Sequence, residues 1–321
     1  MKILPFKVLL AVSLVIITVV MPAFSGEWKK ISLRPDINLT GIHLCSVTDG
    51  FAVSSRGEII QFSTETNELK SGNIEPIVVL QDVYFSPGCL KGILVGNKGT
   101  IMVTEDGGKE WRRLATDSTW WLYRIGFIDS LRGFVLGADM ATSGSLRGVL
   151  LATEDGGSAW DTVSVDMGYQ SKNMNISSDG IIVTLAADKI QISRDRGRKW
   201  ETVALPPQIV VRSVAINENF GLMAGMGGFA AVSKNGGRTW NPLDCFPPYM
   251  NFTDVLLIDS KRAFLIGDNG TILYTDDSGK NWVPELSGVT GELSRIVRIG
   301  GRIFTCGQKG ALLYSEIESG R

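Results

Sequence analysis

The stretch Thr104–Trp111, TEDGGKEW, is one of five copies of the pattern Ser/Thr-x-Asp/Asn-x-Gly-x-x-Trp, and this pattern decides the fold of the chain. The other copies begin at Thr153, Ser193, Ser233 and Thr275, so that successive starts are separated by 49, 40, 40 and 42 residues. A nearly constant period of this size indicates one supersecondary unit that is stacked many times.

The chemistry of this box is that of a tight turn. Its carboxylate or amide can accept backbone N–H bonds, its glycines can take positive φ, and its Trp can bury a large ring against the next unit. Before the first box, the β-rich residues 92–104 flank Asn97-Lys98-Gly99, which is a hairpin signal. We therefore interpret the boxes as structural. Their central residues are Asp106 and Trp111, Asp155 and Trp160, Asp195 and Trp200, Asn235 and Trp240, and Asp277 and Trp282.

Four short strands in each repeat are typical of a propeller blade. The repeat extends to a degenerate first blade, Ser54–Phe62, where Leu69 stands at the Trp position, and to a last blade that runs out of chain before any Trp. The segment around Trp28 resembles the segment around Trp111, so it is expected to supply the outer strand of the last blade. The sequence thus predicts an all-β, seven-bladed β-propeller with blades starting near residues 39, 80, 122, 171, 210, 252 and 293.

The N-terminus has the pattern of a targeting segment. Lys2 and Lys7 precede the apolar stretch Val8–Met21, and Ala23-Phe-Ser25 fits a small-x-small cleavage site. We expect residues 1–25 to be a signal peptide, residues 26–321 to form one propeller domain, and the protein to be exported to the periplasm. An uncleaved segment that holds the protein at the membrane is the alternative, although the apolar stretch is short for a spanning helix.

Composition excludes several classes of function. The chain has 321 residues and a formal net charge of −1, which argues against a general nucleic-acid binder. His43 is the only histidine and lies between Ile42 and Leu44, so we expect it in the core or in the channel wall. A single histidine argues against Ser-His-Asp and Cys-His catalysis and against multi-histidine metal sites. We therefore predict no catalytic residue, no metal and no cofactor.

The four cysteines, Cys45, Cys89, Cys245 and Cys306, show no metal-binding spacing. We expect buried free thiols. An exported chain with an even number of cysteines also permits disulfides, and Cys45 with Cys306 across the ring closure is the pair that the repeat alignment suggests.

The innermost strand of each blade begins with a charged or polar residue, or in one blade with glycine. Aligned by their apolar residues, the seven entry positions are Gly41, Asp82, Arg124, Asn173, Arg212, Asp254 and Arg295. None is apolar, and buried charge is unfavourable unless it is paired, so this is not a simple packing position. In a propeller the position lies near the mouth of the central channel, on the face opposite the boxes.

Loops expected on the same face carry aromatic side chains. Trp121 precedes Arg124, Tyr249 precedes Asp254, and Met140–Arg147 is an insertion in blade three. Arginine and aromatic groups around a polar mouth suit a peptide segment or a carboxylate. The predicted partner-binding residues are Arg124, Arg212, Arg295, Asp82, Asp254, Asn173, Trp121 and Tyr249. The alternative is that the Arg and Asp side chains pair with one another around a solvated channel.

The boxes, the Gly-x-x-Gly-Thr hairpins, the sevenfold count and the export signal together resemble the photosystem II stability/assembly factor family of BNR-repeat propellers. The resemblance covers residues 26–321, and the stretch Val95–Trp111 is typical of it. It implies a non-enzymatic assembly factor that uses an Arg-rich face to hold a membrane-protein subunit, in the thylakoid lumen if the source is photosynthetic. We expect a monomer that binds a protein partner and no nucleic acid.

Sialidases carry the same box and are the enzyme alternative. Arg124, Arg212 and Arg295 would mimic the Arg triad that such glycoside hydrolases use for the substrate carboxylate. Sialidases resemble this chain less closely, because they have six blades and a Phe-Arg-Ile-Pro motif near the start. The nearest match here is Tyr123-Arg-Ile-Gly126, well inside the chain.

Overall fold

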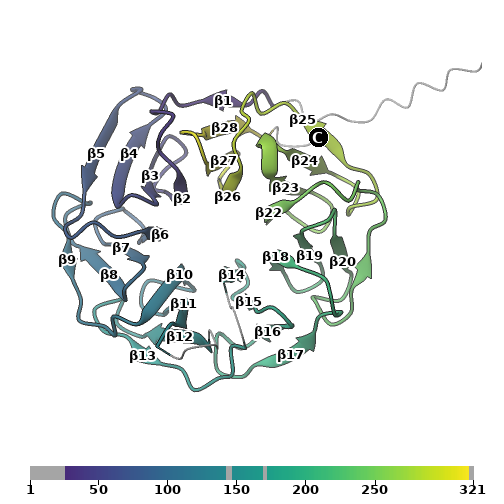
Figure 1. Ribbon diagram of the computed structural model, residues 1–321, viewed down its shortest axis with the longest axis horizontal. Coiled ribbons are helices and arrows are strands. Elements are labelled where there is room, and N and C mark those ends of the chain that lie inside the picture. Colours follow the sequence, from purple (N-terminus) through teal and green to yellow (C-terminus); the bar gives the residue numbers. More distant parts are fainter. Residues whose placement is uncertain (1–25, 142–146, 169–171, 318–321) are drawn as a thin grey trace, which may run out of the picture.

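The computed structural model describes residues 26–141, 147–168 and 172–317. In these residues seven four-stranded antiparallel sheets stand around a common centre (Figure 1). The innermost strands begin at residues 39, 80, 120, 173, 211, 252 and 293, within two residues of the predicted blade starts. The seven-bladed propeller is therefore confirmed. The predicted signal peptide, residues 1–25, lies outside the described residues.

The blades follow one another along the chain, each running from the centre outward. Blade one has β2 (Leu39–Leu44), β3 (Asp49–Ser54), β4 (Glu58–Ser63) and β5 (Leu69–Asn73). Blade two has β6 (Leu80–Phe85), β7 (Gly92–Gly96), β8 (Thr100–Thr104) and β9 (Arg112–Arg113). Blade three has β10 (Trp120–Phe127), β11 (Gly133–Asp139), β12 (Arg147–Thr153) and β13 (Asp161–Thr162). Blade four has β14 (Asn173–Ile176), β15 (Ile182–Leu185), β16 (Lys189–Ser193) and β17 (Glu201–Ala204).

The second half of the ring repeats this plan. Blade five has β18 (Val211–Ile216), β19 (Gly221–Gly225), β20 (Ala230–Ser233) and β21 (Asn241–Pro242). Blade six has β22 (Phe252–Leu257), β23 (Ala263–Gly267), β24 (Ile272–Thr275) and β25 (Val283–Glu285), with the 3-10 turn η1 (Asp268–Gly270) between β23 and β24. Blade seven has β26 (Leu293–Ile299), β27 (Arg302–Gly307), β28 (Leu312–Glu316) and β1 (Lys29–Lys30). In the described part of the chain, no helix is long and apolar enough to cross a membrane.

The two ends of the described chain meet in blade seven. Lys29 lies opposite Tyr314 and Lys30 opposite Leu313, so β1 supplies the outer strand of the last blade, as predicted (Figure 1). The ring of Trp28 is buried in the cluster between blades six and seven and meets Phe264 edge-on, with 6.4 Å between ring centroids. This closure protects the edge of β28 from pairing with other chains.

The boxes form the predicted turns between the third and fourth strands. In the second box, Asp155 Oδ1 accepts hydrogen bonds from Ser158 N at 2.9 Å, Ala159 N at 3.1 Å and Thr153 Oγ1 at 2.8 Å. Thr153 Oγ1 in turn accepts a hydrogen bond from Gly157 N at 2.9 Å. The backbone N–H of Ala159, followed by the Thr153 hydroxyl, lowers the pKa of the Asp155 carboxyl. The box carboxylate therefore accepts hydrogen bonds within its own turn, as the sequence indicates.

The box Trp side chains pack against the preceding blade, whereas the sequence predicted the next one. Trp160 of blade three lies against a cluster that includes Ile93 and Val103 of blade two. Trp240 of blade five lies likewise against Ile181 and other residues of blade four. The reason is topological: each box follows the third strand of its own blade, and its turn folds back under the blade that came before. The core of the protein is thus a set of apolar layers between neighbouring blades.

The prediction of buried free thiols is correct for Cys306 and wrong for the other three cysteines. Cys45 and Cys89 form a disulfide with Cα atoms 5.7 Å apart, because they follow the innermost strands β2 and β6 of adjacent blades at the same end. Cys306 is a buried free thiol, as expected, and Cys245 is free but exposed. Cys306 lies opposite Arg295 in the register of β27 and β26. This is the end of the innermost strands away from Cys45, so the two cysteines cannot form a disulfide.

Candidate functional site

The innermost strands all begin on one face of the ring, opposite the boxes, and we call this the mouth face. Six of the seven strands carry a β-bulge just after they begin. A bulge inserts one unpaired residue and re-aims the side chains around it. The unpaired residues are Thr40, Gln81, Tyr123, Arg212, Thr253 and Ser294. The next position of each strand, together with Asn173 of β14, forms what we call the inner ring.

Arg212 does not belong to the inner ring, so its sequence alignment with Arg124 and Arg295 is wrong by one residue. In β18 the register shifts between Val211 and Ser213, which leaves Arg212 in the bulge and makes Ser213 the ring residue. The spacing of apolar residues cannot reveal a bulge, because the extra residue is absorbed without breaking the strand. The inner ring is Gly41, Asp82, Arg124, Asn173, Ser213, Asp254 and Arg295.

One half of the inner ring is a connected polar chain through blades four to seven. Asn173 Nδ2 donates to Ser213 Oγ at 3.3 Å, and Ser213 Oγ donates to Asp254 Oδ1 at 2.7 Å. Arg295 Nη1 lies 3.3 Å from Asp254 Oδ2, which also accepts the N–H of Ile296 at 3.1 Å. The Asp254 carboxylate is fully buried, yet every oxygen has a partner. The interpretation that Arg and Asp pair around the ring is thus correct for Arg295 and Asp254.

Arg124 and Asp82, in the other half of the ring, are not paired in this way. Asp82 accepts the N–H groups of Val83 at 3.0 Å and Ile125 at 3.2 Å. Burial raises the pKa of the Asp82 carboxyl, and the charges of Arg295 and Arg124 oppose that effect. Among the described residues no carboxylate oxygen lies within 4.0 Å of the Arg124 guanidinium, whose Nη1 donates to Tyr123 O at 3.2 Å and whose buried Nε has no acceptor.

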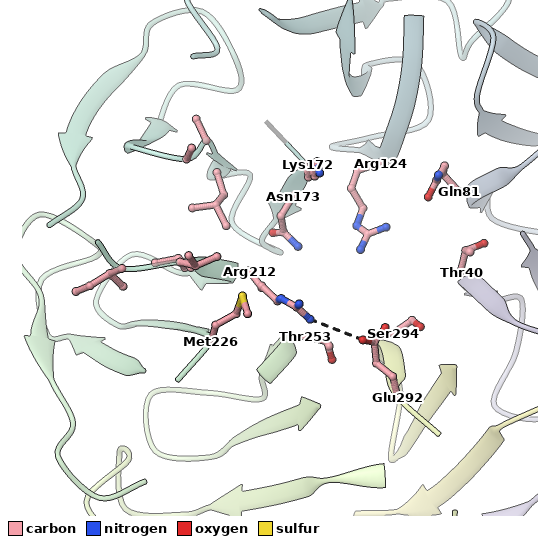
Figure 2. A pocket seen from close by; sticks show the side chains of 16 residues that line it. Thr40, Gln81, Arg124, Lys172, Asn173, Arg212, Met226, Thr253, Glu292 and Ser294 are labelled. Carbon is pink, nitrogen blue, oxygen red and sulfur yellow. Dashed lines mark ion pairs between the residues drawn. The ribbon is translucent and has the colours of Figure 1, made fainter. Parts of the chain in front are cut away.

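A cavity of about 600 Å³ opens on the mouth face above the inner ring. Bulge residues such as Gln81 and Thr253 line it together with Lys172, and Arg124 and Arg212 point into it (Figure 2). Glu292 is the carboxylate in this lining. Three cations against one anion give the cavity a positive balance. We call it the central cavity.

Arg212 and Glu292 face each other across the cavity, from blade five and from the start of blade seven (Figure 2). Arg212 Nη1 lies 3.7 Å from Glu292 Oε2, and the two side chains are 35% and 32% exposed. Burial, followed by the neighbouring charge of Asp268, raises the pKa of the Glu292 carboxyl, while Arg212 lowers it. At this separation the pair is an attraction through space, not a short hydrogen bond, so Arg212 keeps donors for another group.

The other predicted residues lie around the cavity or below it. Asn173 lines the cavity, whereas Arg295 is not part of its lining. Trp121 and Tyr249 are exposed on the mouth face but outside the cavity. In the insertion Met140–Arg147, residues 142–146 lie outside the described part of the chain.

Sequence reasoning missed Lys172 and Glu292. Lys172 comes directly before the ring residue Asn173, and Glu292 comes directly before the first residue of β26. A charged residue just ahead of an innermost strand was therefore an available signal.

His43 lies on the innermost strand β2, and its side chain packs against aromatic rings of blade two. Its imidazole meets Tyr84 at 5.2 Å and Phe85 at 6.1 Å between centroids. Burial lowers the pKa of His43 to about 4, so the imidazole is neutral at neutral pH. Of the three predicted arginines, Arg124 and Arg212 line the cavity. Arg295 is held by Asp254 outside it, so the three do not form a triad there.

Comparison with known proteins agrees with this architecture. A family model described as photosynthesis system II assembly factor YCF48 matches residues 63–167. The photosystem II stability/assembly factor HCF136, chloroplastic, of Arabidopsis thaliana is 30% identical over 138 residues, which cover 39% of this chain and 32% of that protein. The resemblance to the photosystem II stability/assembly factor-like propellers is confirmed.

Solved structures extend the likeness to nearly the whole propeller. YCF48 from Cyanidioschyzon merolae superposes with a TM-score of 0.72 at 16% identity, over 92% of this chain and 100% of that chain. A second structure, YCF48 bound to D1 peptide, gives a TM-score of 0.74 at 18% identity, over 91% and 97% of the two chains. At these identities the likeness shows the fold. These relatives are assembly factors by name, which is compatible with a protein that is not an enzyme.

Proposed function

We propose that this protein is a non-enzymatic propeller that holds an acidic or C-terminal carboxylate segment of a membrane-protein subunit in its central cavity. In this role it acts as an assembly or stability factor for a membrane protein complex. The observation that carries the proposal is Arg124, a largely buried guanidinium that points into the cavity without a carboxylate within 4.0 Å among the described residues.

The electrostatics of the cavity favour an anionic ligand. Asp82 and Asp254 act on Arg124 only through space, and burial still lowers the pKa of its guanidinium. An incoming carboxylate would supply the direct ion-pair partner that a buried cation favours. A guanidinium suits this role because it offers paired donors in a rigid fork. Arg212 and Lys172 add further positive charge above Arg124, where they can steer an acidic segment toward the cavity.

The relatives support a protein partner. One solved structure of the same fold is described as bound to D1 peptide, and the curated relative is a photosystem II stability/assembly factor. We propose the same class of role here, for a monomeric protein exported by residues 1–25 to the periplasm or, in a photosynthetic source, to the thylakoid lumen. Retention of that segment as a membrane anchor is compatible with this role.

The proposal is tested by affinity capture from solubilised membranes of the source, with tagged protein as bait. The variant Arg124→Gln/Lys172→Ala/Arg212→Gln removes the three cavity cations. The matched control, Lys109→Ala/Arg198→Gln/Arg238→Gln, removes the same number and kind of charges from exposed positions in the boxes on the opposite face. Circular dichroism confirms that each variant is folded.

We expect the wild type and the control to recover the same membrane-protein subunit, and the cavity variant to lose it by tenfold or more, as expected when about 1.5–3 kcal/mol is lost for each desolvated charge-assisted contact. Because Arg124 is largely buried, the single variant Arg212→Gln, at a half-buried side chain, is tested as well, and a partial loss is expected. Equal recovery by the folded cavity variant would refute the proposal.

A further inference from the structure

A second hollow adjoins the central cavity on the mouth face. It has a volume of about 660 Å³ and lies over blades five and six. Three connections form it: the residues before β18, the turn between β19 and β20, and the loop between β21 and β22. We call it the rim groove.

The rim groove and the central cavity share part of their lining. Ile209, Val210 and Met226 line both spaces. Val210 and Met226 are 52% and 41% exposed, so apolar surface faces solvent at the junction. Met is flexible and polarizable, and it adapts to apolar partners of differing shape.

The chemistry changes along this path. The central cavity is lined by three cations, whereas the groove contains one ionisable side chain, Asp244, among its thirteen lining residues. Leu243 and Phe246 provide apolar walls and are packed against the core of blades five and six. A ligand that spans both spaces must therefore be anionic at one end and apolar next to it.

The groove is held in shape by main-chain contacts between its three connections. Met226 N donates to Val210 O at 2.9 Å, and Gly228 N donates to Met250 O at 2.7 Å. Gly227 N donates to the side-chain Oδ1 of Asn251 at 3.1 Å. Gly228 has φ +69°, and a Cβ there would lie 2.5 Å from Pro247 O, which explains why glycine stands at this point. A preformed groove lowers the ordering entropy that a ligand must overcome.

We propose that the rim groove binds the apolar residues directly upstream of the carboxylate that enters the central cavity, so that the protein recognises an extended C-terminal tail with an acidic end and an apolar stretch before it. The inference rests on the proposed function, since the carboxylate in the cavity fixes the direction of the tail. The lining residues that the two spaces share, and the change from cationic to apolar lining, support this occupant. Asp244 disfavours a further acidic residue in the groove.

The test uses short synthetic peptides labelled at the N-terminus, and it measures their affinity for the whole protein by fluorescence polarization. Two peptides share an acidic C-terminus and differ upstream, where one carries Leu-Phe-Leu and the other Ser-Asn-Ser. Each is also made with an amidated C-terminus and with Gln in place of its acidic residues. The variant Val210→Ser/Met226→Gln, called the groove variant, makes the exposed junction of the groove and the cavity polar and leaves the cavity cations unchanged. Leu286→Ser is a control at an exposed apolar residue outside both spaces.

We expect the apolar peptide to bind the wild type about tenfold more tightly than the polar one, as the burial of one apolar side chain predicts. The preference should vanish in the groove variant and persist in Leu286→Ser. Equal binding of the two peptides, binding of neither, or a preference that survives in the groove variant would overturn the inference.

The same experiment separates the groove from the cavity. If neutral peptides bind as tightly as acidic ones while the apolar preference still depends on Val210 and Met226, the carboxylate site of the proposed function fails and the groove stands. Sedimentation velocity tests whether the groove instead binds a second copy of the chain. If the wild type self-associates and the groove variant does not, the groove is an interface between copies of this chain, and the inference is wrong.

Discussion

Arg295 Nη1 lies 3.3 Å from Oδ2 of the fully buried Asp254, and this ion pair links the innermost strands of blades six and seven. Asp254 also accepts a hydrogen bond from Ser213 of blade five at 2.7 Å. The pair therefore ties three blades together and removes Arg295 from the cationic lining of the central cavity. Arg124, which occupies the equivalent position in blade three, lines the central cavity instead.

The first prediction concerns this pair. Arg295→Met should lower the free energy of unfolding by about 3–5 kcal/mol, because it leaves a buried carboxylate without its counter-charge. Asp254→Asn/Arg295→Met should recover much of that loss, since both charges are then absent. Urea denaturation of the wild type, the single variant and the double variant measures the effect. A double variant that is less stable than Arg295→Met would show that the pair has a different structural role.

The second prediction concerns ring closure. Trp28 is buried between blades six and seven, so Trp28→Ala should lower the free energy of unfolding by about 3–5 kcal/mol. Leu69→Ala is a suitable control, because Leu69 is exposed on the outer strand of blade one. It should change stability by less than about 0.5 kcal/mol. Equal melting temperatures for Trp28→Ala and the wild type would contradict the closure of the ring by the N-terminal strand.

The third prediction concerns pH and the buried histidine. The pKa of His43 is lowered from 6.5 to about 4 by burial, so the unfolded state binds a proton more readily than the folded state. Its contribution is present in full above pH 6.5 and is lost as the pH falls toward 4, by up to about 3 kcal/mol. The free energy of unfolding of the wild type should therefore fall relative to that of His43→Leu as the pH decreases from 6.5 toward 4. Above pH 6.5 the difference between the two should stay constant.

Because the chain has one histidine, its imidazole titration can be followed directly by NMR. A midpoint for His43 near the ordinary 6.5 would show that the side chain is not buried as described.

The fourth prediction concerns Glu292, which attracts Arg212 at 3.7 Å and thereby competes with an acidic ligand. Its pKa is raised, chiefly by burial and next by Asp268. As the pH falls, Glu292 becomes neutral before an ordinary carboxylate does, so the affinity of the wild type for an acidic peptide should rise while the peptide stays ionised. Glu292→Gln should bind about two- to fivefold more tightly at neutral pH and show a flatter pH profile. A variant with weaker binding would assign Glu292 a direct role in holding the ligand.

The sequence predicts the architecture because each repeat contains residues that can form only one kind of turn. The Asp155 box shows why: each side chain of the pattern has a backbone partner in the turn, so the pattern cannot be kept without the turn. The likeness between the segments around Trp28 and Trp111 was enough to predict the closing strand. The polar character of the inner ring was also predicted, since charged residues recur where packing residues would be apolar.

The finer geometry of the site could not be predicted. A bulge displaces Arg212 by one residue, and it leaves no trace in the apolar pattern of β18. The pairing of Cys45 with Cys89 depends on which strand ends lie side by side, which the spacing of the cysteines along the chain does not encode. The choice of Arg295 as the partner of Asp254, which leaves Arg124 open to the cavity, depends on side-chain geometry across blades.

Site-specific cross-linking in cells of the source tests the central claim most directly. A photo-reactive amino acid replaces Ser294, which lines the central cavity, or Lys109, which lies on the opposite face. The account predicts that position 294 cross-links to an acidic or C-terminal segment of a membrane-protein subunit, that Arg124→Gln/Arg212→Gln abolishes the cross-link, and that position 109 gives none to that subunit. Cross-links to the subunit from position 109, or cross-links from position 294 that persist without the two arginines, would contradict it.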